Sequence, residues 1–565
     1  MQFKKNLIKI YFDHSPSNMI ILCCVLCLAG LFEGIGVISI FPLLNVVMNN
    51  NTNTSDDFFY PLFEKFGLSV SDLNAEVLLI IIIVVFLIKF LFMYLALVLG
   101  GNSAAQFAKD HRNKLLEHLK QASWSFFTKN SVGRISNSLV TETNSIGSGY
   151  NTVINLLSAS VVTFFYLAIS MFTSTFVTMT SIILGLLMMI ILKWIVKITK
   201  KNSELQVETL NKFMTEINEN FQIFKPMKAM ACEDNFSTLM SRSSSDLKKY
   251  QKNIVISLGS IQILQEPIFI IFIASVLYLL SVINPANMMF SEVIFFLILF
   301  YRIFSKVGAL QIYYQKMVSV QAFYWSFDNL VKKTKENKEI VFLGNKKVSL
   351  DNKIEFKNVS FKYEDSNVIN NLSFSVKSKE IFSIFGPSGL GKTTIIDLIV
   401  GLFLPNKGSI EIDNISTVNL DTLDWRKKIG YVPQDAILVN DSIANNVTFM
   451  DKTFKDHDIL NSLKYANIHK HISSLSEGIH SNVGEKGMLL SGGQRYRVSI
   501  SRALIRKPKL LILDEPTAAL DKENKISLIA TLKKLKKNIT ILCVTHDDIL
   551  IKSSDNFLDL TTNRQ

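Results

Sequence analysis

A glycine-rich segment beginning at Gly386 has the spacing of a phosphate-binding loop. It follows an apolar strand over residues 381–385 and precedes a helical pattern over residues 394–402. Glycines let backbone N–H groups curl around phosphate oxygens, and the start of the following helix adds partial positive charge. The lysine of such a loop reaches the terminal phosphates, and the next hydroxyl ligates Mg²⁺. We therefore predict a nucleotide site formed by Gly386, Pro387, Ser388, Gly389, Leu390, Gly391, Lys392, Thr393 and Thr394.

Two carboxylates end a second apolar strand further along the chain. Residues 510–513 are all Leu or Ile, and Asp514 and Glu515 follow them directly. The aspartate suits Mg²⁺, and the glutamate suits the polarisation of an attacking water. The segment Leu-Ser-Gly-Gly-Gln lies between the two motifs, at residues 490–494. Together these motifs predict nucleotide hydrolysis rather than a glycine-rich turn without function.

The elements around these motifs predict a soluble α/β domain over residues 347–565. Short apolar strands alternate there with turns and amphipathic helices, a pattern typical of α/β domains. A polar, lysine-rich stretch at residues 326–346 precedes it and is predicted to be a linker. It carries Lys332, Lys333, Lys335 and Lys338.

Residues 1–325 have the composition of a membrane domain. The whole chain of 565 residues is 48% hydrophobic but only 19% charged, below the roughly 25% charge of ordinary soluble domains. Six apolar runs each reach the roughly 20 residues that a helix needs to cross a bilayer. They lie at about 19–48, 77–99, 148–172, 175–196, 255–283 and 293–314. The expected fold is an all-α, six-helix transmembrane domain fused to an α/β domain with a phosphate-binding loop.

The distribution of positive charge predicts the orientation in the membrane. Formal net charge is +13, and the connections at 101–145 and 193–252 are rich in Lys and Arg. Residues 49–75, by contrast, contain a single lysine. By the positive-inside rule, both termini and both long connections are expected in the cytoplasm. The charge excess is thereby explained by topology, and a nucleic-acid partner is not expected. Five cysteines do not suggest a disulfide framework.

These motifs together resemble the ATP-binding cassette (ABC) exporters, in which six membrane helices are fused to one nucleotide-binding domain. The resemblance covers essentially the whole chain and implies ATP and Mg²⁺ as ligands. It implies catalytic roles for Glu515, His546 and Gln434, and metal contacts by Thr393, Gln434 and Asp514. It also implies adenine stacking on Tyr363, phosphate contacts by the signature residues Ser491, Gly492, Gly493 and Gln494, and an interface loop, Ala519-Leu-Asp521.

The resemblance further implies that two chains act together. The signature of one copy would face the phosphate-binding loop of the other, so two ATP molecules would join the two domains. Because every motif is intact, a homodimer with two competent sites is expected, while a heterodimer remains an alternative. Two departures from the family pattern, Tyr496 and Asp547, are not expected to touch phosphate. Docking helices are expected near 118–128 and 226–236.

Charged residues inside the apolar runs are the candidate substrate contacts. Lys89, Arg302 and Lys306 could line a cavity and attract an anionic head group, whereas Glu33 and Glu266 could instead form structural ion pairs. The connection at 49–75 places Phe58, Phe59, Leu62, Phe63 and Phe66 on one helical face, which is typical of a segment lying in the membrane interface.

The membrane features are similar to those of lipid-linked oligosaccharide flippases. The expected function is ATP-driven export or flipping of a lipid-linked, anionic substrate across the cytoplasmic membrane, in a bacterial cell. The alternatives are export of a peptide, bacteriocin or hydrophobic drug. A non-transporting regulatory ATPase is a further class, which the complete set of hydrolytic motifs disfavours.

Overall fold

The computed structural model describes most of the chain as two compact units. Described residues are 7–48, 75–173, 175–283, 290–339, 346–364, 366–387, 389–518 and 520–561. The units comprise residues 1–338 and 339–565. The predicted interface segment at 49–74, most of the outer connection, lies outside the described residues, as do Ser388 and Ala519.

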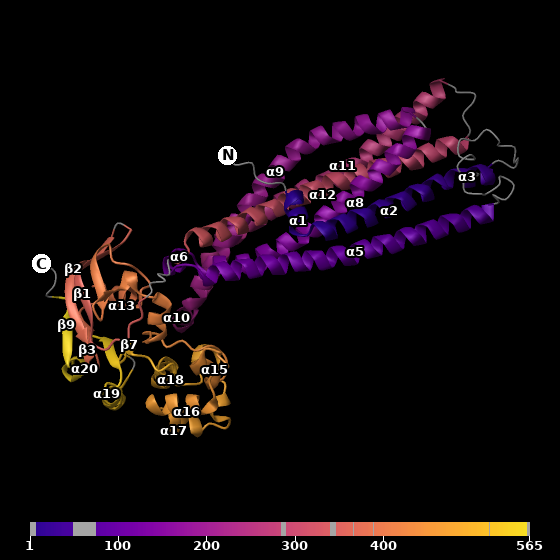
Figure 1. The fold of residues 1–565 in the computed structure, drawn as a ribbon. Helices are drawn as coiled ribbons and strands as arrows, with labels where there is room; N and C mark the ends of the chain where they lie inside the picture. The colour runs from indigo at the N-terminus through magenta and orange to yellow at the C-terminus, as the bar shows by residue number, and fades with distance from the viewer. Residues whose placement is uncertain are drawn as a thin grey trace. The chain divides into compact units, whose positions relative to one another are not determined.

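Unit 1 is entirely helical in its described residues (Figure 1). Its helices are α1 (Leu7–His14), α2 (Pro16–Ile38), α3 (Ile40–Met48), α5 (Ala75–Lys120), α6 (Trp124–Lys129), α7 (Val132–Asn137), α8 (Thr143–Thr173), α9 (Thr175–Gln222), α10 (Phe224–Ala229), α11 (Asp234–Ile283) and α12 (Phe290–Glu336), with a π-helical segment (Ser138–Glu142) before α8.

Six helical segments among the described residues are long and apolar enough to cross a membrane, which confirms the six predicted spans. Several are much longer than predicted. Helix α5 has 46 residues and α11 has 50, so at about 1.5 Å per residue each reaches some 70 Å, well beyond the hydrocarbon layer. The additional turns carry the polar residues that the sequence analysis assigned to cytoplasmic connections.

The predicted linker starts later than expected. Helix α12 continues to Glu336, so the lysine-rich stretch from residue 326 is its last three turns. Phe327, Leu330 and Val331 recur at helical spacing there and are buried beside Leu115 of α5. Burial of this apolar face keeps the segment helical, while its lysines point outward.

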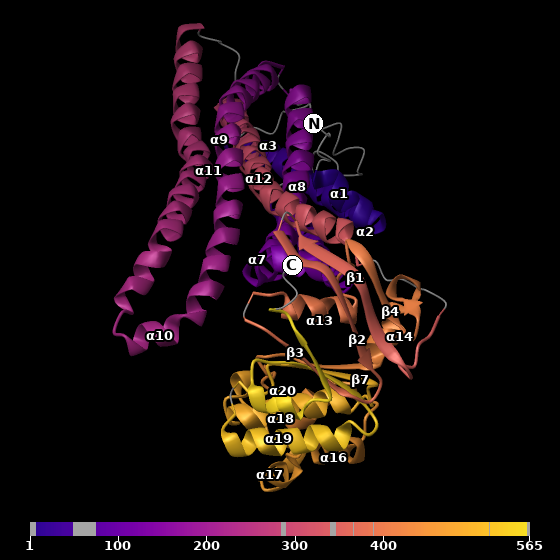
Figure 2. The same cartoon turned by 90° about the vertical axis from the view of Figure 1, so that its left-hand side faces the viewer.

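Short helices lie in both segments that were predicted to dock. Helix α6 falls in the first, and α10 connects the long helices α9 and α11 at the tip of their hairpin (Figure 2). The turn after α10 contains Ala231 at φ 53° and is closed by an ion pair of 2.7 Å between Lys228 and Glu233.

Unit 2 contains two sheets. A parallel sheet has the order β6-β7-β8-β3-β9, and an antiparallel sheet has the order β2-β1-β4-β5. The strands are β1 (Lys353–Tyr363), β2 (Ser366–Lys377), β3 (Ile381–Phe385), β4 (Lys407–Ile412), β5 (Ile415–Ser416), β6 (Ile429–Val432), β7 (Leu510–Asp514), β8 (Thr540–Val544) and β9 (Asn556–Asp559).

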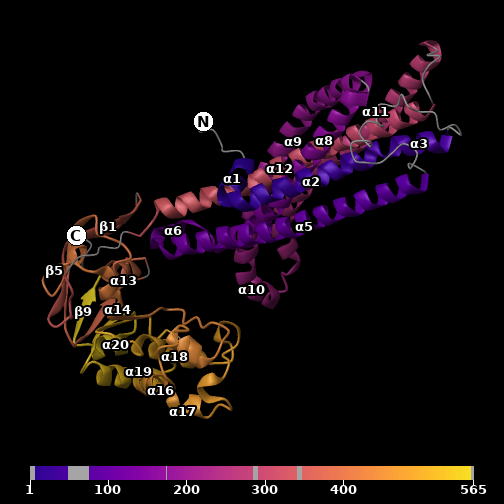
Figure 3. The same cartoon turned by 45° about the vertical axis from the view of Figure 1, so that its right-hand side comes forward.

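Helices surround the parallel sheet (Figure 3). They are α13 (Lys392–Val400), α14 (Thr422–Lys427), α15 (Ile443–Thr448), α16 (Asp456–Tyr465), α17 (His469–Ser473), α18 (Gly492–Leu504), α19 (Lys522–Leu535) and α20 (Asp548–Ser553), with single 3₁₀ turns at Thr417–Asn419, Gly478–His480 and Glu485–Gly487.

Strand β7 explains why the sheet is central to this unit. All five of its residues are buried, and alternate side chains join two different apolar clusters. Leu511 and Leu513 pack with residues of α16, α18 and α19, whereas Leu510 and Ile512 pack with residues of α13 and the antiparallel sheet. A strand that is covered on both faces is expected to be apolar throughout. This explains the continuous run of Leu and Ile at residues 510–513.

Candidate functional site

Three neighbouring parallel strands deliver the predicted catalytic groups to one edge of the sheet. In the register of β7, β8 and β3, Asp514 pairs with Val544, and Ile384 also pairs with Val544. The backbone N–H of Glu515 donates to Val544 O at 2.8 Å, and that of Thr545 donates to Ile384 O at 3.0 Å. The segments that follow these strands therefore leave the sheet at its carboxyl end, where open α/β sheets bind ligands.

The loop after β3 has a backbone suited to an anion. Gly386, Gly389 and Gly391 have φ values of 152°, 85° and 83°, which residues other than glycine rarely adopt. A Cβ on Gly391 would also lie 2.9 Å from Val368. Helix α13 begins directly after Gly391, so the unpaired amides of its first turn face the loop.

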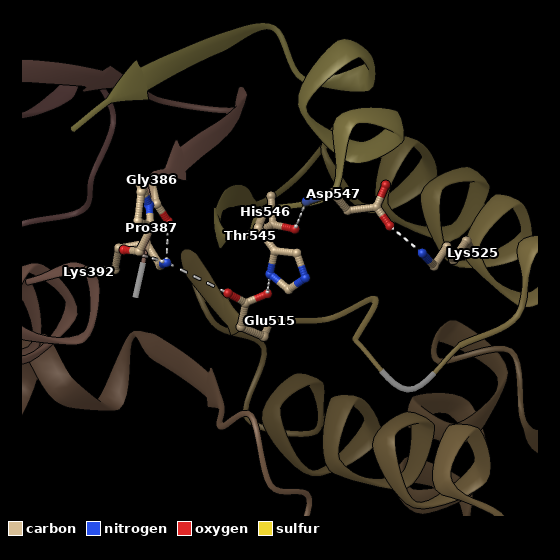
Figure 4. A network of polar contacts seen from close by, with 8 residues as sticks. All are labelled: Gly386, Pro387, Lys392, Glu515, Lys525, Thr545, His546 and Asp547. Carbon is tan, nitrogen blue, oxygen red and sulfur yellow. Dashed lines mark hydrogen bonds and ion pairs between the residues drawn. The ribbon is translucent and has the colours of Figure 1, made fainter. Parts of the chain in front are cut away.

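The amine of Lys392 lies over this loop (Figure 4). Its Nζ donates to the carbonyl oxygens of Gly386, at 2.5 Å, and of Pro387, at 3.3 Å. The same Nζ lies 3.9 Å from Oε1 of Glu515. A cation held between the loop and a carboxylate is placed to meet the charge of a phosphate bound by the loop amides.

Glu515 is held from its other side by His546 (Figure 4). The His546 Nδ1 lies 2.8 Å from Glu515 Oε2. The Glu515 side chain is 11% exposed, whereas that of His546 is 70% exposed. Glu515 also adopts a left-handed φ of 48°, a strained conformation for a residue with a side chain and one that often marks a functional site. The structure thus brings together Lys392, Glu515 and His546, three of the residues named in the sequence analysis, and their catalytic roles stay a prediction.

Asp514 lies among carboxylates that a divalent cation would stabilise. Asp514 is 7% exposed, and its pKa is raised by burial and by the neighbouring Glu515, against the effect of Lys392. Burial, and then Asp514, raises the pKa of Asp397 on α13 to about 6. A divalent cation would stabilise such crowded carboxylates, and the Thr393 hydroxyl and Gln434 amide are oxygen donors of the kind Mg²⁺ prefers. The sequence analysis missed Asp397, although it lies one helical turn after Thr393.

Tyr363 lies beside α13, the helix that follows the phosphate-binding loop. Its hydroxyl is 3.4 Å from that of Thr394, and its ring packs edge-on against Phe361 and Phe403. The ring is 38% exposed, so one face remains available for an adenine. Adenine stacking on Tyr363 stays a prediction. Phe403, three residues after the end of α13, packs against this ring and was not identified from the sequence.

The signature segment is preorganised as a helix start, with Ser491 exposed and Gly492, Gly493 and Gln494 half-buried. Ser491 caps α18, accepting from Gln494 N–H at 3.3 Å, and Ser491 N–H donates back to Gln494 Oε1 at 2.8 Å. Gly492 and Gly493 thus present first-turn amides. Asp521 similarly caps α19 through Asn524 N–H at 2.8 Å. The side-chain oxygen of Gln494 accepts the capping hydrogen bond, which leaves the side-chain NH₂ group of Gln494 to donate to a ligand.

Comparison of the sequence with known protein families shows to which family the chain belongs. Residues 369–518 match the family described as ABC transporter, and residues 19–307 match the ABC transporter transmembrane region, which is half of the chain by itself. The chain is an ABC transporter. It is a multi-pass membrane protein with an ATPase domain that binds ATP and couples its hydrolysis to transport.

Similar proteins cover the transporter to different extents. The ATP-dependent lipid A-core flippase of Syntrophus aciditrophicus is 27% identical over 575 residues, spanning 99% of this chain and 90% of its own. Heavy metal tolerance factor 1 of Caenorhabditis elegans is 39% identical over 208 residues, 37% of this chain and 26% of its own. A bacterial Atm1-family ABC exporter solved with ATP bound has a TM-score of 0.77 at 20% identity, covering 96% of this chain and 92% of its own. The transporter therefore has the ABC exporter fold.

Four of the charged residues inside the transporter's membrane spans, Glu33, Lys89, Arg302 and Lys306, form one network. Lys89 Nζ lies 3.2 Å from Glu33 Oε2, and Lys306 Nζ lies 3.5 Å from Glu33 Oε1. The Tyr166 hydroxyl donates to the same Oε1 at 2.7 Å, and Arg302 lies beside that hydroxyl. The structure brings together the three predicted cavity cations and the carboxylate that was named as a possible ion-pair partner. Tyr166 was missed, because a tyrosine in an apolar run carries no signal of its own. Glu266 is exposed in this chain.

Proposed function

We propose that the transporter flips or exports an anionic, lipid-linked substrate across the cytoplasmic membrane, using a homodimer with two ATP sites. The nucleotide-binding unit and both termini would lie in the cytoplasm, as the positive-inside distribution of Lys and Arg indicates. ATP binding would close the paired nucleotide-binding units, and α6 and α10 would pass this motion to the membrane helices. Hydrolysis would then reset the transporter.

The observation that supports an anionic substrate is the imbalance of charge in the membrane network. Lys89 and Lys306 share the Glu33 carboxylate, and Arg302 joins them through the Tyr166 hydroxyl, so the network has a formal charge of +2. Each cation at such a depth costs about 3 kcal/mol or more on insertion scales, so structural pairing alone would call for a matching number of carboxylates. The phosphate or pyrophosphate of a lipid head group would complete the balance.

The exposure of these side chains points the same way. The Glu33 carboxylate is only 4% exposed, whereas the Lys89 and Lys306 side chains are 22% and 30% exposed. The carboxylate is therefore enclosed, whereas the two lysine side chains are partly exposed. The similarity to a lipid A-core flippase over 99% of the chain supports a lipid as the substrate's carrier. The alternative, a peptide or hydrophobic drug, has no comparable support in the charge pattern.

On the ATP side, this chain's residues have distinct tasks in the proposed reaction. The loop amides and Lys392 bind the phosphates, and Glu515 accepts a proton from the attacking water. His546 holds the Glu515 carboxylate through the 2.8 Å contact. When Mg²⁺ is bound through Asp514, Thr393 and Gln434, it supplies positive charge against the developing charge on the phosphates.

The charge hypothesis is tested by two double variants that remove equal numbers of charged groups. Lys89→Met with Arg302→Met removes the surplus, whereas Glu33→Gln with Lys89→Met removes one neutral pair and retains the surplus. We expect the first variant to lose flipping of a fluorescent polyprenyl-pyrophosphate glycan in proteoliposomes, with basal ATP hydrolysis retained. The second variant should keep most flipping.

Three results would contradict the proposal. Full flipping by Lys89→Met with Arg302→Met would show that the cations do not bind the head group. Equal loss in both variants would indicate a structural role for the ion pair. ATP hydrolysis that is stimulated by peptides but not by the polyprenyl-pyrophosphate glycan would favour the peptide alternative. Lys197→Ala, an exposed lysine of α9, serves as the control for general loss of charge.

A further inference from the structure

Unit 2 contains a cavity that shares no residue with the predicted ATP site. It has a volume of about 680 Å³, within the range of small-molecule sites. It lies between the ends of α16 and α18, helix α19, and the turns that precede β7 and β8 (compare Figure 2). Its lining contains neither the phosphate-binding loop nor the signature, Glu515 or His546.

The cavity is strongly basic. Lys464, Lys507, Lys509 and Lys534 line it, and no Asp or Glu does. Elsewhere in this unit some lysines have carboxylate partners, such as Lys428 with Asp424 at 2.6 Å. Four like charges around one opening repel one another and attract anions. This arrangement is therefore more stable when an anion occupies the cavity.

Backbone contacts fix the positions from which these lysines extend. Lys507 adopts a left-handed φ of 50°, and its N–H donates to Leu504 O at 2.9 Å. Lys509 is held on both sides, since its N–H donates to Lys428 O at 2.7 Å and its carbonyl accepts from Thr540 N–H at 2.9 Å. A ligand would have to order only the lysine side chains, which lowers the entropic cost of binding.

The other surfaces of the cavity limit the kind of anion. Its floor is apolar, with Leu504 and Leu535 buried at 6% and 9% exposure and Ile539 beside them. Tyr465 at its rim is 64% exposed and offers a flat aromatic face. Inorganic phosphate would leave the floor and the ring without contacts. A ligand with a planar, partly apolar group and at least two negative charges would use all three features.

We propose that this cavity is a second, non-catalytic site for a nucleoside phosphate. The base would stack on Tyr465 and cover the apolar floor, while the lysines neutralise the phosphate. The ligand would also touch the beginnings or ends of three elements of the ATP site. Leu504 ends α18, which starts with the signature; Lys509 precedes β7, which leads to Glu515; and Ile539 precedes β8, which leads to His546. Occupancy is therefore expected to change ATP turnover.

The test uses AMP, which lacks the β- and γ-phosphates that the loop and Lys392 bind. Radiolabelled AMP should bind to the full-length, detergent-solubilised transporter at one molecule per chain. The Lys392→Ala variant should retain this binding. Lys464→Ala with Lys534→Ala should weaken it by about tenfold or more, equivalent to about 1.4 kcal/mol. Lys470→Ala with Lys552→Ala, two exposed lysines of the same unit outside the cavity, should bind AMP as the parent does.

Competition and turnover complete the test. Unlabelled GMP should displace AMP at about tenfold lower concentration than inorganic pyrophosphate, because only the nucleotide contacts the floor and ring. Saturating AMP should change ATP turnover at least twofold in the parent and not in the Lys464 and Lys534 double variant. Loss of AMP binding in Lys392→Ala, equal displacement by pyrophosphate, or an unchanged ATP turnover would each overturn the proposal. These results do not depend on which substrate the transporter moves.

Discussion

At the scale of single residues, Glu515 combines enclosure, strain and two polar neighbours. Its carboxylate lies between Lys392 and His546 at the end of β7, with a left-handed backbone. Glu515→Gln should reduce ATP turnover by roughly 100-fold or more, because a neutral amide cannot accept the proton of the attacking water. ATP binding should persist and hold the dimer closed, as measured by nucleotide trapping. Turnover within a few-fold of the parent would contradict this role.

Lys392→Ala should act at an earlier step. The amine now bridges the loop carbonyls and Glu515, so its loss removes the cation that meets the phosphates. We expect weaker ATP binding and no nucleotide-dependent dimer closure, measured by equilibrium binding and cross-linking. Lys392→Arg retains the charge and is the matched control. If Lys392→Ala closes normally with ATP, the loop amides alone carry phosphate binding.

These catalytic candidates could be named from the sequence because each lies in a short motif of fixed spacing next to a strand. Lys392, Glu515 and His546 each follow a recognisable strand, and parallel pairing of those strands brings them together. Asp397 and Tyr166 were missed for the opposite reason. Asp397 gains its importance from Asp514, more than a hundred residues away, and Tyr166 from Glu33 on another helix. Contacts between elements of this kind leave no mark in residue spacing.

At the scale of elements, the turn after α10 is a candidate for coupling ATP hydrolysis to transport. The Lys228–Glu233 ion pair closes this turn at the tip of the α9–α11 hairpin. Glu233→Lys should leave ATP hydrolysis measurable and lower transport, because the turn would open. Combining it with Lys228→Glu restores opposite charges and should recover part of the transport. Unaltered transport by Glu233→Lys would show that this segment is not a docking element.

A buried carboxylate joins three helical segments of unit 1. Glu142 ends the π-helical segment, is fully buried, and accepts hydrogen bonds from Ser138 at 2.7 Å, Asn211 at 3.3 Å and Ser326 at 2.6 Å. Glu142→Leu would remove the acceptor of the Ser138 and Ser326 hydroxyls, at about 1–3 kcal/mol for each buried donor left unpaired, while Asn211 would keep its hydrogen bond to Ser326. The expected result is a clear fall in the thermal unfolding temperature. Glu208→Leu, at an exposed site on α9, should change it little.

Element types were predicted better than element ends. Apolar runs define where a helix meets lipid, so all six spans were found, but they do not reveal how far a helix continues into water. Helix α12 extends to Glu336 because Phe327, Leu330 and Val331 pack against neighbouring helices. The π-helical segment before α8 was also missed. There Arg112 of α5 donates to the carbonyl of Leu139, a contact made possible only by tertiary packing.

At the scale of the whole molecule, the signature at the start of α18 is the reason to expect two copies. Ser491 and the glycines after it form a helix start whose amides are directed at no charged group of this chain among the described hydrogen bonds and ion pairs. The phosphate-binding loop supplies the other half of an anion site. Suppose that each ATP site combines the loop of one copy with the signature of the other. The number of working ATP sites then depends on whether a loop substitution and a signature substitution lie in the same chain or in different chains.

Mixed dimers of differently tagged chains test this arrangement. Lys392→Ala damages a loop, and Gly492→Asp places a negative charge where the signature would meet phosphate. When each chain carries one substitution, the loop of one chain and the signature of the other remain intact together, so one working site is left. When both substitutions lie in one chain and its partner is unmodified, both composite sites are damaged. ATP hydrolysis by purified mixed dimers should therefore survive in the first arrangement and disappear in the second. ATP hydrolysis that disappears in the first arrangement and survives in the second would mean that each chain completes its own ATP site. A second copy would then not be required for hydrolysis.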